Sequence, residues 1–297
     1  MRLRPPVLDD APGVLAVFAA REMADIGAPI HRLEDLREEW QGTELDLEDD
    51  ARVVEAEAGR IVAYAAVRRH GTLAVVAPEY EGGGIGARLL EWAEGRERVH
   101  GHPRYRQWVA ATNASAGELL TRAGYAKARS YWRLVRPLEG VGVPAPPPAG
   151  LHLRSVEVER DAPSLHALDA ASFAGAPDYS TESLELFREE HLDAHDFDAG
   201  LSVVAEREGR IVAFLLARRR DEEGVGFVAI LAVDPEHQRR GIGSTLLQSA
   251  FAGFAVAGLR EAMLMVASDN PQALRVYERV GMMVQLQFDI YERPSGT

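Results

Sequence analysis

The residues of this chain best suited to chemistry form a glycine turn between an apolar run and a helical pattern. The run Phe227 to Val233 comes first, and the turn consists of Gln238, Arg239, Arg240, Gly241, Ile242, Gly243 and Ser244. Glycines let the backbone curl close to a ligand, and the free N–H groups and dipole of a helix start favour an anion. The segment therefore fits a phosphate or a pyrophosphate, although short glycine turns before helices are also common as purely structural features.

The spacing of the turn separates it from better-known phosphate loops. A P-loop has Lys and then Ser or Thr after its last glycine, and a dinucleotide-binding turn has a third glycine; this segment has neither. The turn instead resembles the acyl-CoA pyrophosphate loop of the GNAT N-acetyltransferase superfamily, whose pattern is Gln/Arg-x-x-Gly-x-Gly/Ala. Gln238, Gly241 and Gly243 fill that pattern.

A second motif follows at Asn270 to Gly281. Locally it predicts a helix with Asn270 as N-cap, Pro271 at the first helical position and Gly281 just after the end. It also resembles the GNAT pattern Asn-x-x-Ala-x-x-x-Tyr-x-x-x-Gly. That resemblance implies that Asn270 contacts the pantetheine arm and that Tyr277 is the general acid for the leaving thiolate. The acetyl-CoA site that it implies also includes Leu231, Val233, the seven turn residues and Ala273.

The sequence repeats itself. Pro235, Gly241 and Gly243 echo Pro78, Gly84 and Gly86 at one offset (235 − 78 = 157), and Asn270 and Ala273 echo Asn113 and Ala116 at the same offset. We predict two tandem domains, 1–139 and 151–297, joined by the proline-rich linker 140–150. Each is expected to be an α/β domain with a mixed sheet flanked by helices, and the resemblance implies that the sheet splays open beside the glycine loop.

The two copies differ at the positions that matter for chemistry. Leu120 stands in the place of Tyr277, and Glu81 replaces Gln238. Gly82, Gly83, Gly84, Ile85 and Gly86 still form a glycine turn and a possible second cofactor site, but without the arginines. The N-terminal copy is therefore expected to be catalytically degenerate. Three roles stay open for it: weak acyl-CoA binding, binding of something else, or bracing of its neighbour.

Composition excludes several functions. With no cysteine there is no disulfide framework or thiolate site, and the net charge of −13 argues against a nucleic-acid partner. No apolar run approaches the roughly 18 residues of a membrane span, so a cytoplasmic protein without a membrane partner is expected. His191 and His195 share helical spacing but lack a His-Glu-x-x-His pattern, so no metal is expected. The sequence indicates no oligomeric state.

The reaction implied by the resemblance is transfer of an acetyl group from acetyl-CoA to a primary amine of a small molecule, in the C-terminal copy. The run Phe227 to Val233 contains no acid, so the general base is open, with Glu206 or the segment His191 to Asp198 as candidates. Phe173 to Tyr179 lies where family members shape the acceptor pocket. The tandem arrangement also resembles mycothiol synthases, and a non-catalytic acyl-CoA-binding or sensing protein is the third alternative.

Overall fold

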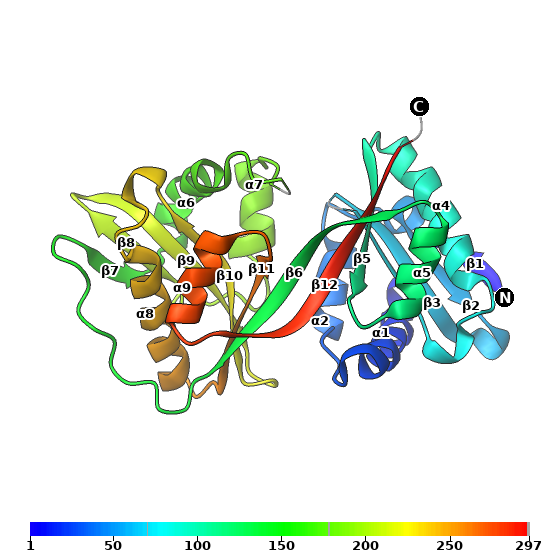
Figure 1. Ribbon diagram of the computed structural model, residues 1–297, viewed down its shortest axis with the longest axis horizontal. Helices are drawn as coiled ribbons and strands as arrows, with labels where there is room; N and C mark the ends of the chain where they lie inside the picture. The colour runs from blue at the N-terminus through cyan, green and yellow to red at the C-terminus, as the bar shows by residue number, and fades with distance from the viewer. Residues whose placement is uncertain (70, 178, 296–297) are drawn as a thin grey trace. The chain divides into compact units, whose positions relative to one another are not determined.

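The computed structural model describes residues 1–69, 71–177 and 179–295, which form two compact units (Figure 1). Unit 1 contains Met1–Tyr131 and Leu286–Thr297, and unit 2 contains Trp132–Gln285. No helix among the described residues is long and apolar enough to cross a bilayer.

Unit 1 is a mixed sheet flanked by helices. Its sheet runs in the order β1-β2-β3-β4-β5-β12, with the pairing of β4 and β5 parallel and the pairs β1–β2, β2–β3, β3–β4 and β12–β5 antiparallel. The strands are β1 (Arg2–Arg4), β2 (Ala51–Glu55), β3 (Ile61–Arg68), β4 (Gly71–Val76), β5 (Arg104–Ala110) and the end of β12 (Met283–Pro294). The helices are α1 (Ala11–Ile26), α2 (Leu33–Gln41), α3 (Leu47–Asp50), α4 (Ile85–Val99) and α5 (Ala114–Arg122), with short η1 (Leu8–Asp10), η2 (Glu57–Gly59) and η3 (Pro78–Tyr80).

Unit 2 has the same plan, in the strand order β7-β8-β9-β10-β11-β6. Its strands are β7 (His152–Ser155), β8 (Val203–Arg207), β9 (Arg210–Arg220), β10 (Val225–Val233), β11 (Glu261–Ala267) and the end of β6 (Ala126–Pro137). Its helices are α6 (Val158–Phe173), α7 (Leu184–Phe187), the π-helical turn η4 (Arg188–Leu192), η5 (Pro235–His237), α8 (Ile242–Val256) and α9 (Pro271–Arg279). The mixed, helix-covered sheet predicted for each copy is confirmed.

The internal repeat is visible element by element. The helices α4 and α8, the strands β5 and β11, and the helices α5 and α9 begin 157 residues apart (242 − 85 = 261 − 104 = 271 − 114 = 157). In the second copy, Asp221 to Gly224 form the turn between β9 and β10, which pair from Arg220 and Val225 onward.

The last strand of each copy crosses the boundary between the compact units. Residues from Leu286 onward belong to unit 1, where Phe288–Pro294 pair antiparallel with Arg104–Ala110, whereas Trp132–Pro137 of β6 belong to unit 2. The compact units therefore do not coincide with the ranges 1–139 and 151–297 expected from the repeat. The reason is physical: β6 and β12 carry the same local pattern, and alternation along a strand does not say which sheet edge it joins.

Opposite faces of the unit 2 sheet are covered by different helices. Along β9, Ala213 and Leu215 pack in the cluster that contains α8, whereas Phe214 and Leu216 pack in the cluster that contains α6. This alternation is expected because successive strand residues point to opposite faces.

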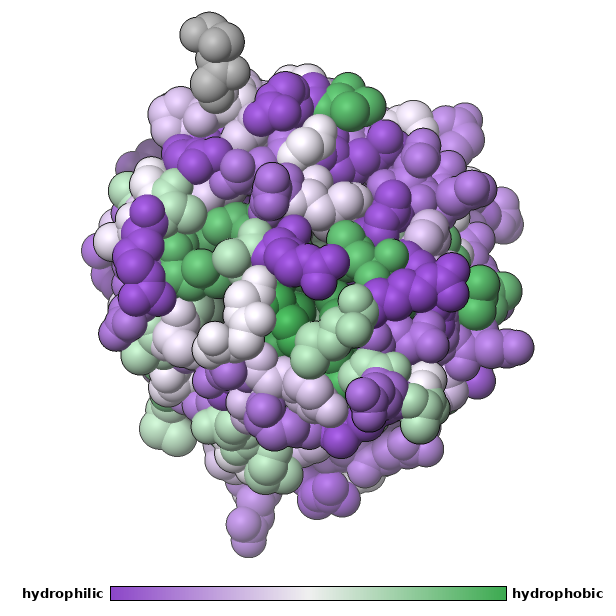
Figure 2. Space-filling model, turned by 90° about the vertical axis from the view of Figure 1, so that its right-hand side faces the viewer, coloured by the Kyte–Doolittle hydropathy of each residue, from purple (hydrophilic) through white to green (hydrophobic). Residues whose placement is uncertain are grey.

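On the surface, Figure 2 shows a face on which hydrophilic residues prevail and apolar residues form small groups between them.

The parallel strand pair of each unit comes apart part-way along its length. In unit 2, the pairing of β10 with β11 joins Val225–Phe227 to Glu261–Met263, although both strands continue beyond it. In unit 1, the parallel pairing of β4 with β5 joins Thr72 to Gln107. A bulge between Val228 and Ile230 further bends β10. Each sheet therefore opens between its parallel strands ahead of its glycine turn, as the family resemblance implied.

A buried acid in unit 1 makes stability depend on pH. Glu97 is 0 % exposed and accepts hydrogen bonds from the Thr72 hydroxyl and, at 3.2 Å, from the Arg106 N–H. Burial raises the pKa of Glu97 from 4.5 to about 7. Between these values the folded chain keeps a proton that the unfolded chain has lost, so the free energy of unfolding falls as pH rises through this window.

We predict that Glu97→Gln removes this pH dependence, because the amide is neutral throughout and can still accept from Arg106. At pH 8 the variant should be more stable than the parent by about 3 kcal/mol, with little difference at pH 4. Urea unfolding at both pH values measures this, with Glu91→Gln on the exposed face of α4 as control. Equal pH slopes for Glu97→Gln and the parent would contradict the assignment.

Candidate active site

The glycine turn of unit 2 contains two residues in the left-handed conformation, one a glycine and the other an arginine. Gly241 (φ 81°) precedes α8 as its N-cap, and Arg239 (φ 61°) is also left-handed. The corresponding residues of unit 1 are Gly84 and Gly82, both at positive φ (239 − 82 = 157). The turn is therefore the same in both units, but unit 2 keeps an arginine where glycine would relieve a strain of about 1 kcal/mol. Backbone strain of this kind concentrates at ligand sites.

The side chains of the turn leave an anion-binding face open. Gln238 Nε2 donates to the Val233 carbonyl at 3.1 Å, which ties the turn to the end of β10, and Arg240 Nη2 donates to the Glu236 carbonyl at 3.0 Å. The buried Ser244 hydroxyl has no hydrogen-bond partner among the described residues. A buried polar atom without a partner, beside the N–H groups of a helix start, fits a bound phosphate group.

The turn, the end of β10 and the helix α9 meet at one place. A Cβ atom added to Gly243 would lie 3.9 Å from the side chains of Leu231, Val233 and Val276. Together with Ile242, Ala273 and Tyr277, these side chains belong to one apolar cluster. Residues far apart in the sequence and predicted to share a site are thus brought together by the fold. The following predicted residues lie there: Leu231, Val233, Gln238, Ile242, Gly243, Ala273 and Tyr277.

The helix α9 presents Asn270 and Tyr277 as predicted locally. The Asn270 Oδ1 accepts from the Ala273 N–H at 3.0 Å, so Asn270 is the N-cap, and this leaves its amide NH₂ group for a ligand. Tyr277 is 9 % exposed, and burial raises its pKa to about 12. The phenol is therefore protonated at neutral pH, which is the state that a proton donor needs.

An acidic group that the sequence did not single out lies on α6. Asp169 is buried and accepts from the Tyr179 hydroxyl at 3.0 Å, and burial raises the pKa of its carboxyl group. One turn later, the Ser172 hydroxyl donates to the Val233 carbonyl at 3.2 Å, so this helix lies beside the end of β10. The only sequence signal was an aspartate on the apolar face of a helix, directly after Leu168. Asp178 of the predicted acceptor segment lies outside the described residues.

The structure separates the candidates for the general base. The Oε1 atom of Glu206 on β8 is engaged by Arg154 at 2.7 Å and by Arg160 at 2.9 Å, so this carboxylate already belongs to an ion-pair network. Asp196 lies 3.4 Å from both Arg218 and Arg220, which engage it in the same way.

His191 is another candidate of the predicted segment. Its Nε2 lies 3.5 Å from Glu182 and 3.8 Å from Glu190, and its ring packs edge-on against Phe187. The buried Nδ1 atom has no hydrogen-bond partner among the described residues. His191 also interacts electrostatically with Asp169. Asp169, Tyr179 and His191 thus form one titratable cluster beside α6.

In unit 1, the residues that correspond to Gln238 and Asn270 are Glu81 and Asn113, and both form hydrogen bonds with other side chains of the unit. Glu81 accepts from Arg21 and, at 2.8 Å, from the Ser115 hydroxyl. Asn113 caps α5 as Asn270 caps α9, but its Nδ2 donates to Asp25 at 3.0 Å. A carboxylate therefore lies beside the glycine turn of unit 1, where unit 2 has the neutral Gln238.

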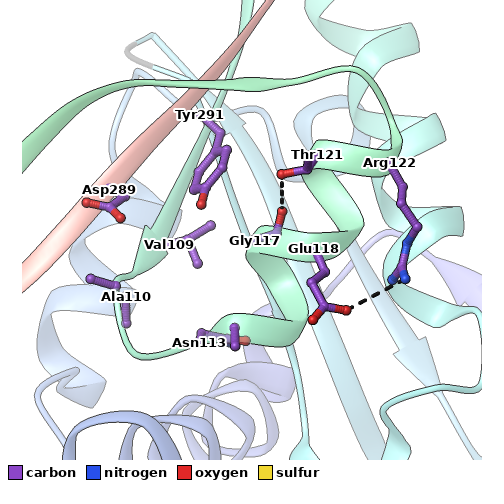
Figure 3. Close-up of a pocket in the computed structure, with 11 residues that line it drawn as sticks. Val109, Ala110, Asn113, Gly117, Glu118, Thr121, Arg122, Asp289 and Tyr291 are labelled. Atoms are coloured by element: carbon purple, nitrogen blue, oxygen red, sulfur yellow. Dashed lines mark hydrogen bonds and ion pairs between the residues drawn. The ribbon is translucent and has the colours of Figure 1, made fainter.

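Tyr291 of β12 does not supply a phenol group at the position where Leu120 replaces the tyrosine of unit 2. Figure 3 shows Tyr291 pointing toward α5 at Gly117, in a cavity of about 520 Å³ that Asn113 also lines. A Cβ atom on Gly117 would lie 2.9 Å from the Tyr291 hydroxyl, so this contact requires glycine. Leu120 instead lines the neighbouring cleft, whose described lining residues do not include Tyr291. The cleft of unit 1 thus has no phenol at the position of Tyr277.

The sequence matches the Acetyltransferase (GNAT) family twice, over residues 20–125 and 163–282. The chain belongs to the GNAT acetyltransferase family. The two matches confirm the tandem GNAT arrangement, and membership makes the chain an N-acetyltransferase with an acyl-CoA cosubstrate.

Among curated relatives, the mycothiol acetyltransferase of Thermobispora bispora is 33% identical over 213 residues, which cover 70% of both chains. That of Actinosynnema mirum is 31% identical over 75% of this chain and 71% of its own.

Solved structures share the fold along the whole chain. A GCN5-related N-acetyltransferase from Sphaerobacter thermophilus superposes with a TM-score of 0.83 at 27% identity, covering 100% of this chain and 96% of its own. A tandem GNAT protein from the clavulanic acid biosynthesis pathway has a TM-score of 0.79 at 17% identity, covering 100% and 99%. N-myristoyltransferase of Saccharomyces cerevisiae with bound myristoyl-CoA shares the fold at 12% identity and a TM-score of 0.68, covering 99% and 78%.

We predict that Gln238→Glu weakens acetyl-CoA binding about tenfold, because it places a carboxylate beside the phosphate groups, as Glu81 does in unit 1. Calorimetric titration of acetyl-CoA measures the change. The matched control is Glu81→Gln, which should leave the affinity of the unit 2 site unaltered. Unchanged binding by Gln238→Glu would show that the phosphates lie elsewhere.

Proposed function

We propose that unit 2 transfers an acetyl group from acetyl-CoA to a primary amine of a small molecule. The observation that carries this proposal is the meeting of the strained glycine turn, the end of β10 and the buried phenol of Tyr277 in one cluster. Unit 1 has the same framework, but with Glu81 and Leu120 at the decisive positions.

The proposed binding mode follows from the open strands. The pyrophosphate lies on the turn Gln238–Ser244, where Arg239 supplies positive charge and the start of α8 supplies N–H groups. The pantetheine arm enters between β10 and β11 beyond Phe227 and Met263, where backbone groups of the parted strands need hydrogen-bond partners. Asn270 lies at the start of α9 and offers its amide to the arm.

In the proposed reaction, the neutral amine nitrogen attacks the thioester carbonyl and the C–S bond breaks. The proton leaving the nitrogen passes to Asp169, whose pKa is raised by burial and whose carboxylate accepts a hydrogen bond from Tyr179, with His191 beside it. The proton needed by the thiolate, whose acid has a pKa of about 8.5, comes from the Tyr277 hydroxyl. The step leaves Asp169 protonated and Tyr277 as a phenolate, and proton exchange with solvent returns both groups to their starting states before the next turnover.

A mycothiol-related amine is the second candidate acceptor within the same reaction. The 33% and 31% identities to mycothiol acetyltransferases, over 70% and 75% of this chain, favour it. Assaying turnover with a mycothiol-related amine beside unrelated primary amines separates the two. A kcat/KM at least about tenfold higher for the former would assign it as the acceptor class.

We predict that Tyr277→Phe lowers kcat about 100-fold and leaves the KM for acetyl-CoA within about twofold, because a general acid acts in the transition state and not in cosubstrate binding. Steady-state kinetics with saturating amine measures the split. An equal turnover for Tyr277→Phe and the parent would refute the role of Tyr277. Absence of turnover with every amine, with acetyl-CoA still bound, would favour a sensing protein instead.

We predict that Asp169→Asn lowers kcat/KM at neutral pH by at least about tenfold and that the deficit shrinks as pH rises. The sign follows because a base works only when deprotonated: the parent loses activity as pH falls through the raised pKa of Asp169, while at high pH the amine reaches the site already neutral. A pH–rate profile of both proteins tests this. A deficit that is the same at every pH would mean that Asp169 only supports the fold.

A further inference from the structure

The cleft of unit 1 encloses a cavity of about 440 Å³, within the size range of small-molecule sites. It lies between the parted ends of β4 and β5, the start of α4 and the helices α1 and α5. Apolar side chains make up much of its wall: Phe18, Leu73, Val75, Leu90, Leu120 and Phe288. The cavity occupies in unit 1 the place that the acyl arm takes in our proposal for unit 2.

A buried donor without a partner lines this cavity. Gln107 is 4 % exposed, and its Nε2 atom has no hydrogen-bond partner among the described residues. Its backbone pairs with Thr72 at the point where β4 and β5 part, so Gln107 lies at the inner end of the cleft that it lines. The Arg21 Nε atom, on another wall, is also buried and unpartnered. A buried donor left unsatisfied destabilises a protein, so the Gln107 donor fits an acceptor supplied by a ligand in this cavity.

The charges around the cavity disfavour an anionic ligand. Glu22, Asp25 and Glu81 line it, and Arg21 already pairs with Asp25 at 2.7 Å and with Glu81. Arg122 is paired with Glu118 at 3.7 Å, and His31 with Glu22. Burial raises the pKa of Asp25, which reflects how poorly solvated the site is for negative charge. Glu81 directly precedes the glycine turn, at the position that Gln238 has in unit 2.

We propose that the cleft of unit 1 binds an uncharged small molecule with an apolar body and a carbonyl or hydroxyl oxygen, and not the nucleotide of acyl-CoA. The oxygen accepts from Gln107 Nε2, and the apolar body fills the space lined by Phe18, Leu73 and Leu120. The ligand is held and not acylated, because the position of the general acid is Leu120. This site stands independently of the reaction proposed for unit 2.

The test uses the full chain and two matched probes, N-cyclohexylacetamide and the anion cyclohexylacetate. Nitrogen-15 NMR follows the side-chain amide of Gln107, assigned by its loss in Gln107→Met. We expect the neutral amide to shift this signal at millimolar concentration and the anion to bind at least about tenfold more weakly. Gln107→Met should weaken the binding of N-cyclohexylacetamide about tenfold, with acetyl transfer and acetyl-CoA affinity unchanged. If Gln107→Met does not fold, Phe18→Trp serves in its place. This substitution narrows the cavity and should also weaken the binding of N-cyclohexylacetamide.

Three results would overturn the proposal. Equal affinity for cyclohexylacetate would remove the argument from charge. Failure of the neutral amide to shift the Gln107 signal would remove the site. A shift of that signal by acetyl-CoA would mean that unit 1 is a second cosubstrate site, a result that leaves the reaction proposed for unit 2 standing.

Discussion

The feature on which the two sites depend is the early parting of a parallel strand pair. In unit 2, β10 and β11 pair from Val225 to Phe227 and then diverge, and the bulge before Ile230 directs the rest of β10 away. A sheet that opens in this way leaves backbone groups that must find partners, and it leaves room for an extended arm. The glycine turn follows directly, so the opening and the anion-binding helix start are products of one stretch of chain. Unit 1 opens after Thr72 and Gln107 in the same manner.

The two units show how a shared framework can take different chemistry through a few side chains. Unit 2 keeps Arg239 in a left-handed conformation that glycine would adopt more easily, and it keeps a buried, protonated phenol at Tyr277. In unit 1, Gly82 adopts the left-handed conformation of the same turn without strain. Glu81, which contacts Arg21 and Ser115, lies directly before this turn. Charge therefore distinguishes the units more than shape does.

Much of this arrangement could be predicted from the sequence, because the informative signals are local. The N-cap Asn270, the left-handed Gly241 and the offset of 157 residues each depend on neighbouring residues, and the structure has all three. The exchange of β6 and β12 between units could not be predicted, because a strand pattern does not specify its sheet edge. Asp169 was missed because its significance comes from burial and from Tyr179, which only the fold provides. The preference for one acceptor amine likewise depends on side chains that only the fold brings together.

The central claim is that one of the two glycine turns binds the cosubstrate and the other is closed by its own carboxylate. The most direct measurement is the stoichiometry of acetyl-CoA binding to the full chain by isothermal titration calorimetry. The account predicts one molecule per chain, with the Tyr277→Phe variant binding the same number. Two molecules per chain would contradict it, because the Glu81 turn would then accept a pyrophosphate despite its carboxylate.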